Sequence, residues 1–222
     1  MGTSASPSGK NNDLAIDPTA FVEWTKANSR SLLIAGAIVV VGGASVLFAR
    51  QSAALRNERA EVAYGTAQGA FYSGNLTQAK TDLEALVGRY PSTSGGTQGA
   101  MLLAQILYND GKHDEGIKRL TAIQGSAPRQ FASALEELIA AGYADSNRPD
   151  QAADHYLKAA DASPFPAEQD GFRADAARIL EAAGKADQAK AIWTKLAAAP
   201  GSPSSVEASL RLGELAAKVA TP

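Results

Sequence analysis

The sequence contains no cysteine and only two histidines among its 222 residues. The lack of cysteine excludes disulfides, thiolate nucleophiles and cysteine-ligated zinc, iron or haem, and it leaves the redox compartment open. The formal net charge is only −2, so the chain lacks the basic surface that nucleic acid requires. Aromatic residues make up 6%, whereas alanine occurs 46 times, so small, helix-favouring side chains carry the apolar content. We therefore predict an all-α protein with no nucleic-acid partner.

Recognisable catalytic motifs are also missing: there is no P-loop, no HExxH, no GxSxG and no glycine-rich dinucleotide loop. His113 and His155 are far apart in the chain, and a lone surface histidine is more often solvated than catalytic or metal-binding. Glu136 and Glu137 are adjacent on an expected helix, so they point about 100° apart and do not share a site easily. The sequence predicts a protein that is not an enzyme, with no cofactor, no metal and no small-molecule substrate.

One apolar segment is long enough to cross a membrane. Nineteen uncharged residues, Ser31 to Ala49, lie between Arg30 and Arg50, and at 1.5 Å per residue a helix of that length spans a hydrocarbon core of about 30 Å. We predict a transmembrane helix at 31–49 after a polar tail at 1–30. A cleaved signal peptide is the alternative, but its apolar run is usually about 7 to 15 residues and starts closer to the N-terminus.

The orientation of this segment does not follow from charge alone. Basic residues occur on both sides of it, at Lys26, Arg30, Arg50, Arg56 and Arg59. A long domain after an apolar segment is translocated largely regardless of charge, so we expect a cytoplasmic N-terminus and a C-terminal domain across the membrane. Gly36 and Gly43 are seven residues apart on one helix face, which favours close packing with another membrane helix. Alternatively, glycine is simply frequent in membrane helices.

The rest of the chain contains an internal repeat with a period of 36 to 37 residues. Each unit contains a turn residue, a small residue five positions later, a bulky residue four positions further on, and then a proline. The turn residues are Gly74, Gly111, Asn147 and Gly184, and the small residues are Ala79, Gly116, Ala152 and Ala189. The bulky residues are Leu83, Leu120, Tyr156 and Trp193, and the prolines are Pro91, Pro128, Pro164 and Pro200. Small residues also recur before each turn, at Ala67, Ala104, Ala140 and Ala177. Such units bury their apolar faces only by stacking, which predicts a helical solenoid.

The order of these residues resembles the tetratricopeptide repeat, although that repeat usually has a period of about 34 residues. The resemblance implies about four helix pairs in residues 50–202 and a capping helix within 203–222. Two features depart from the family pattern. Gly116 replaces an expected alanine, and the segment PSTSGGTQG at 91–99 reads as a glycine-rich insertion.

The first helices of such pairs line a concave groove. By the repeat register, the inward positions of the first two units form the predicted partner-binding site: Tyr64, Gln68, Phe71, Tyr72, Met101, Gln105, Tyr108 and Asn109. Aromatic, amide and methionine side chains suit a polypeptide ligand. The equivalent later positions form a smaller, more charged surface: Glu137, Ala141, Asp145, Arg178 and Glu181. Alternatively, the aromatic residues belong to the core or contact the helix that enters the repeats.

As a whole, the chain resembles bacterial single-pass periplasmic tetratricopeptide proteins, and within them the family of the ancillary subunit of the Sec translocon. The resemblance implies an interaction scaffold in the bacterial cytoplasmic (inner) membrane, with its C-terminal domain in the periplasm. Its partners would be other membrane-protein subunits or a periplasmic protein or peptide. The alternative is a permanent structural accessory subunit of a large photosynthetic or respiratory membrane complex.

Overall fold

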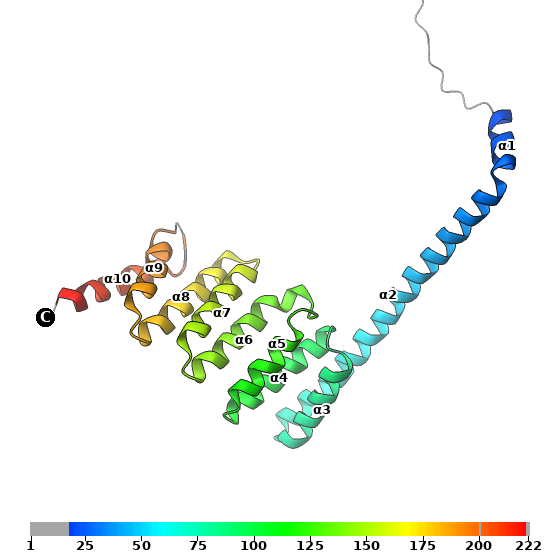
Figure 1. Ribbon diagram of the computed structural model, residues 1–222. Coiled ribbons are helices and arrows are strands. Elements are labelled where there is room, and N and C mark those ends of the chain that lie inside the picture. Colours follow the sequence, from blue (N-terminus) through cyan, green and yellow to red (C-terminus); the bar gives the residue numbers. More distant parts are fainter. Residues whose placement is uncertain (1–17, 200, 221–222) are drawn as a thin grey trace, which may run out of the picture. The chain divides into compact units, whose positions relative to one another are not determined.

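The computed structural model describes residues 18–199 and 201–220, and every regular element in these ranges is helical (Figure 1). The helices are α1 (Pro18–Ala27), α2 (Ser29–Tyr72), α3 (Leu76–Arg89), α4 (Ser94–Asn109), α5 (His113–Ile123), α6 (Ala132–Asp145), α7 (Pro149–Ala162), α8 (Pro166–Ala182), α9 (Ala186–Ala197) and α10 (Ser205–Ala220), with a 3₁₀ turn η1 (Arg129–Phe131) before α6. The all-α prediction is confirmed. The chain divides into two compact units, 1–53 and 54–222, which are described separately.

The first unit carries the apolar segment. Residues 1–17 of the predicted polar tail lie outside the described residues, and residues 18–27 of it form α1. The segment at 31–49 belongs to α2, the one described helix that is long and apolar enough to cross a membrane. The large side chains whose exposure is described there point to solvent, with Leu33 at 73% and Phe48 at 75% exposed. No atom lies within 4 Å of a side chain added at Gly36 or Gly43, so their packing against another helix remains a prediction.

In the second unit, the four predicted turn residues all have positive φ angles. The values are 81° at Gly74, 74° at Gly111, 57° at Asn147 and 75° at Gly184. Glycine and asparagine tolerate this left-handed region best, which is why they end the first helix of each pair. The helix pairs α2–α3, α4–α5, α6–α7 and α8–α9 follow from these four turns.

The small residues of the repeat lie where helices meet. Those before the turns (Ala67, Ala104, Ala140 and Ala177) and three of those after them (Ala79, Ala152 and Ala189) are completely buried. The bulky residues Leu83, Leu120 and Trp193 are equally buried, and Tyr156 packs against the last core cluster. Trp193 is the largest fully buried side chain among the described residues. The repeat register read from the sequence therefore matches the observed packing.

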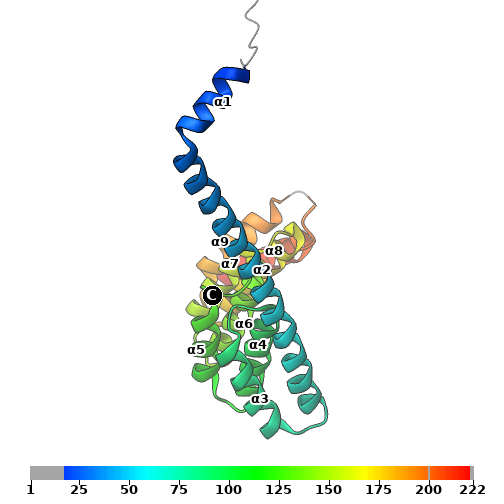
Figure 2. The ribbon, with the colours of Figure 1, turned by 90° about the vertical axis from the view of Figure 1, so that its right-hand side faces the viewer.

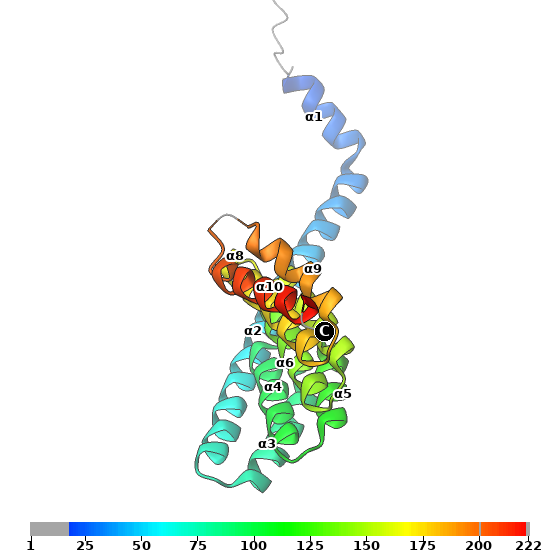
Figure 3. The same ribbon diagram turned by 90° about the vertical axis from the view of Figure 1, so that its left-hand side faces the viewer.

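The core consists of three successive clusters rather than one centre. The first joins α3 and α4 to residues 60–71 of α2, the second joins α4, α5 and α6, and the third joins α7, α8, α9 and α10. Figure 2 shows the tight turn between α2 and α3, and Figure 3 shows α10 beside α9. Each helix pair thus completes its core with the next pair, as expected for a solenoid.

The segment 91–99 is not an insertion, because Ser94 already begins α4. A Cβ added at Gly95 would lie 2.6 Å from the carbonyl oxygen of Ala60, and one at Gly96 would lie 1.8 Å from that of Tyr90. A Cβ at Gly99 would meet Leu86 Cδ2 at 2.6 Å. These glycines therefore let the first turns of α4 approach the backbone of α2 and the end of α3.

Candidate functional site

A hollow of about 410 Å³ brings six of the eight predicted groove residues together. It is lined by Tyr64, Gln68, Phe71 and Tyr72 of α2, by Gln98, Met101, Leu102 and Gln105 of α4, and by Phe131 and Ala134 at the start of α6. All of these residues lie in the second unit. The lining carries no formal charge, so it offers broad apolar contact and amide hydrogen bonds rather than an ion-pairing partner.

Local contacts hold the α2 side of this first hollow in place. Gln68 Nε2 donates a hydrogen bond to the Tyr64 hydroxyl at 3.1 Å. The rings of Phe71 and Tyr72 meet edge to face with centroids 5.5 Å apart, while Tyr72 remains 76% exposed. Burial is the largest cause that raises the pKa of Tyr64, so its hydroxyl stays protonated and able to donate. The hollow therefore presents ordered aromatic edges to solvent.

The other two predicted residues lie elsewhere. Tyr108 is 9% exposed and belongs to the second core cluster, where its hydroxyl donates to the carbonyl oxygen of Leu138 at 3.1 Å. Its ring occupies the space that a side chain at Gly116 or Gly142 would need, which explains the departure from alanine at Gly116. Asn109 is exposed at the end of α4 and does not line the hollow. Tyr108 thus follows the alternative interpretation, a core aromatic.

Sequence reasoning missed four residues of the lining. Gln98 lies one turn before Met101 on α4, so the helical register could have identified it. Leu102 is buried, with only 8% of its surface exposed, so little of it reaches the hollow. Phe131 and Ala134 come from the next repeat, and only the stacking of α6 beside α4 brings them to the hollow.

A second and larger hollow, of about 770 Å³, lies between α6 and α8. Its lining is Arg129, Gln130, Ser133, Ala134, Glu137, Ala162, Pro164, Phe165, Glu168 and Phe172. The sequence placed a smaller, more charged surface at Glu137, Ala141, Asp145, Arg178 and Glu181, and of these five residues only Glu137 lines this hollow. Phe165 and Phe172 add apolar walls that the register did not include.

The walls of the second hollow that α6 and α8 supply each carry a carboxylate, from Glu137 and Glu168. Burial, together with the nearby carboxylates of Asp175 and Glu168, raises the pKa of Glu137. Burial also raises the pKa of Asp175, although Arg178 Nη1 lies 2.5 Å from its carboxylate and opposes the shift. Arg178 in turn binds both carboxylate oxygens of Glu207 on α10, at 2.8 and 2.6 Å, and is thereby held at the end of the repeats.

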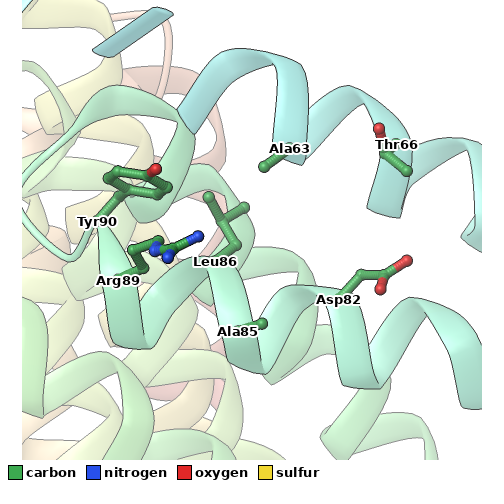
Figure 4. A pocket seen from close by; sticks show the side chains of 7 residues that line it. All are labelled: Ala63, Thr66, Asp82, Ala85, Leu86, Arg89 and Tyr90. Carbon is green, nitrogen blue, oxygen red and sulfur yellow. The ribbon is translucent and has the colours of Figure 1, made fainter. Parts of the chain in front are cut away.

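A third, smaller hollow of about 300 Å³ lies between α2 and α3 (Figure 4). Arg89 and Tyr90 mark one end, Thr66 and Asp82 mark the other, and Ala63, Ala85 and Leu86 lie between them. Its charged groups are separated rather than convergent, so they do not form a site around one ligand atom. The sequence did not predict this hollow.

The two histidines lie in packed surroundings. His155 Nδ1 is 2.6 Å from Glu136 Oε2, and its ring stacks on Tyr143. The ring of His113 stacks on the Tyr108 ring, and its Nδ1 is buried without a hydrogen-bond partner. Within the described ranges, no group of three or more histidine, aspartate or glutamate side chains is placed to hold a metal ion. These arrangements suit structural roles for both histidines.

Comparisons with known proteins agree with the architecture. The profile of a family described as "Tetratricopeptide repeat-like domain" matches residues 23–216. Two crystal structures of tetratricopeptide-like repeats of a putative kinesin light chain from Podosopora anserina, one of them carrying a single substitution, each align with a TM-score of 0.53 and 16% identity. Each alignment covers 74% of this chain and 88% of the other chain, and at this identity it supports the fold alone. The comparison with curated proteins gave no match.

Proposed function

The chain belongs to the tetratricopeptide repeat-like domain family, and from that premise we propose that it is a non-catalytic, membrane-anchored scaffold for protein–protein interaction. The observation that carries this proposal is the first hollow, where Tyr64, Gln68, Tyr72, Met101 and Gln105 converge from two successive first helices. Aromatic rings supply contact area at low entropic cost, and the amides can bond to a polypeptide backbone. The occupant is a segment of a partner protein.

The anchor in this proposal is the segment at 31–49. A span of exposed leucine, isoleucine, valine and phenylalanine is costly in water and favourable in hydrocarbon. The matched family profile starts at residue 23, so it includes this segment together with the repeats. The repeats would lie on the periplasmic side of a bacterial cytoplasmic membrane, because long domains after an apolar segment are translocated largely regardless of charge.

Within this class, we propose a role beside the Sec translocon, in line with the resemblance to its ancillary subunit. The partners would be translocon subunits, membrane-bound periplasmic chaperones or the emerging chain. A permanent accessory subunit of a photosynthetic or respiratory complex is the second candidate. Gly36 and Gly43, seven residues apart on one face of α2, favour close packing with a neighbouring helix in either case.

One experiment separates these candidates. Native membranes are solubilised in mild detergent, the chain is recovered through a C-terminal tag, and the molar ratios of co-purifying proteins are measured. Translocon and chaperone subunits below equimolar amounts support the ancillary role, whereas one bioenergetic complex at a fixed ratio supports the structural role. A Gly36→Leu, Gly43→Leu variant alters the membrane face and leaves the hollows intact, so it shows which co-purified proteins depend on that face. Recovery of the wild-type chain alone contradicts both candidates.

A further inference from the structure

The second hollow keeps a large apolar surface exposed. Phe165 is 59% exposed, which is high for a large apolar side chain, and Phe172 lines the same hollow. Pro166 follows Phe165 and restricts its backbone to the extended region, where φ is −106° and ψ is 117°. Phe165 is therefore the residue that precedes α8 and not part of the helix, and its side chain lies at the helix start. Together with Ala134, Ala162 and Pro164, it forms an apolar wall that water covers poorly.

Two carboxylates face the same hollow. Glu137 comes from α6 and Glu168 from the first turn of α8. Ser163 Oγ donates a hydrogen bond to Glu168 Oε2 at 2.7 Å and so restrains that carboxylate. Among the described residues, no ion pair joins a lysine or arginine to either glutamate, and Arg178 on α8 is held by Asp175 and Glu207. Arg129 is the only basic residue of the described lining.

We infer that the hollow between α6 and α8 receives a lysine or arginine side chain of the bound polypeptide, next to an apolar residue of the same segment. This inference rests on the proposed function, because it assumes that a polypeptide occupies the concave face. A long cationic side chain places its methylene stem on an aromatic ring and its charged end among carboxylates. A neutral apolar side chain matches only the aromatic wall, and an acidic side chain matches neither surface because the two glutamates repel it.

The two hollows adjoin, which defines the segment more closely. Ala134 lines both of them, so one segment can lie across the aromatic and amide side chains of the first hollow and reach Glu137 in the second. The first hollow has no formal charge, whereas the second has two glutamates and one arginine. The ligand is therefore a neutral, apolar stretch that carries a basic residue toward one end.

The test uses fluorescein-labelled peptides with a common phenylalanine- and leucine-rich half and one variable position, filled with arginine, methionine or glutamate. Binding to the full chain in detergent micelles is measured by fluorescence anisotropy. We expect the arginine peptide to bind about fivefold more tightly than the methionine peptide, as for a partly exposed ion pair. Glu137→Gln should remove most of this preference, and Asp161→Asn, the same charge change at an exposed position of α7, should change it less than about twofold.

The outcomes separate the inference from the proposed function. Binding of all three peptides with equal affinity, or an arginine preference that survives both Glu137→Gln and Glu168→Gln, overturns the inference while the polypeptide-binding face stands. Absence of binding for every peptide contradicts the proposed function and the inference together. Far-UV circular dichroism of each variant verifies that its helices are formed, so a loss of binding is not a loss of fold.

Discussion

Two stretches of the same helix, α2, differ in what they bury. At 31–49 the large side chains Ile38, Val41 and Phe48 are 65% to 75% exposed. At 60–71 the side chains that contact other helices are mostly small, and Ala60 and Ala67 are completely buried against α3 and α4. Helical structure alone thus does not determine the surroundings of a segment. The size and spacing of its apolar residues do.

The difference also separates two kinds of partner. Large aliphatic residues over most of a helix, as at 31–49, suit hydrocarbon, where no polar face is needed. Small residues on one face suit another helix, because backbones approach closely only where side chains are short. Gly95 on α4 illustrates the same principle, since a Cβ added there would lie 2.6 Å from the Ala60 carbonyl oxygen of α2.

The largest expected effect comes from a charge in the first stretch. Val40→Asp should oppose membrane insertion by about 3 kcal/mol, because a carboxylate near the centre of a span is costly in hydrocarbon. The measurement is the fraction of the chain that resists alkaline extraction from membranes. Val62→Asp in the same helix, where Val62 is 68% exposed, is the matched control and should leave that fraction unchanged. Equal loss for both variants would contradict the distinction between the two stretches.

The second expected effect concerns the packing of the other stretch. Gly95→Ala should destabilise the repeats by about 2 kcal/mol, because its Cβ would lie 2.6 Å from a backbone oxygen that cannot rotate away. Urea unfolding followed by far-UV circular dichroism measures the change. Gly43→Ala, where nothing lies within 4 Å, should leave the midpoint unchanged. A similar midpoint for the Gly95 variant and the wild type would refute the proposed α2–α4 contact.

A smaller effect is expected at the C-terminal end of α2, where exposure serves binding. Tyr72→Ala should weaken the affinity for the apolar peptides by about 1 kcal/mol, since the exposed ring borders the first hollow. Anisotropy titration gives the affinity, and thermal unfolding should be unaltered because the side chain is 76% exposed. Val62→Asp again provides the comparison, as an exposed position outside that lining.

The smallest expected effect is a dependence of stability on pH, caused by the second hollow. The first hollow, which α2 lines in part, has no charged residue in its lining and should show no such dependence. Folding raises the pKa of Glu137, so the neutral carboxyl stabilises the fold at acidic pH, and this contribution is lost as pH rises through the folded pKa. Glu137→Gln should therefore increase stability at pH 7 by less than about 0.5 kcal/mol, with no gain near pH 3. Urea midpoints at both pH values measure this difference. A gain at pH 3 that equals the gain at pH 7 would show that the charge is not the cause.

The sequence predicted the repeats well because their rules are local. Gly74, Gly111, Asn147 and Gly184 adopt the expected left-handed conformation, and the small residues at fixed offsets from them are buried. The residue type at a turn depends on the backbone conformation of that residue alone, so a single sequence is sufficient to find it. The same register found six residues of the first hollow.

The errors have a different physical origin. Gly95, Gly96 and Gly99 made the segment 91–99 resemble an insertion, because glycine disfavours helices, yet each is required by a close contact with another element. Tyr108 fits the register of the groove, but the space at Gly116 and Gly142 admits its ring to the core. The second hollow depends on Phe165, whose exposure follows from the turn before α8. Such tertiary effects do not follow from periodicity.

The central claim is that the concave face of an anchored repeat domain holds a partner protein. Its most direct test is photo-crosslinking in native membranes, with a benzoylphenylalanine placed at Gln105 in the first hollow or at Lys118 on α5, away from both hollows. The account predicts a discrete crosslinked protein from Gln105 and none from Lys118, with the Gln105 product lost on Tyr72→Ala. Equal crosslinking from both positions, or none from Gln105, would contradict it.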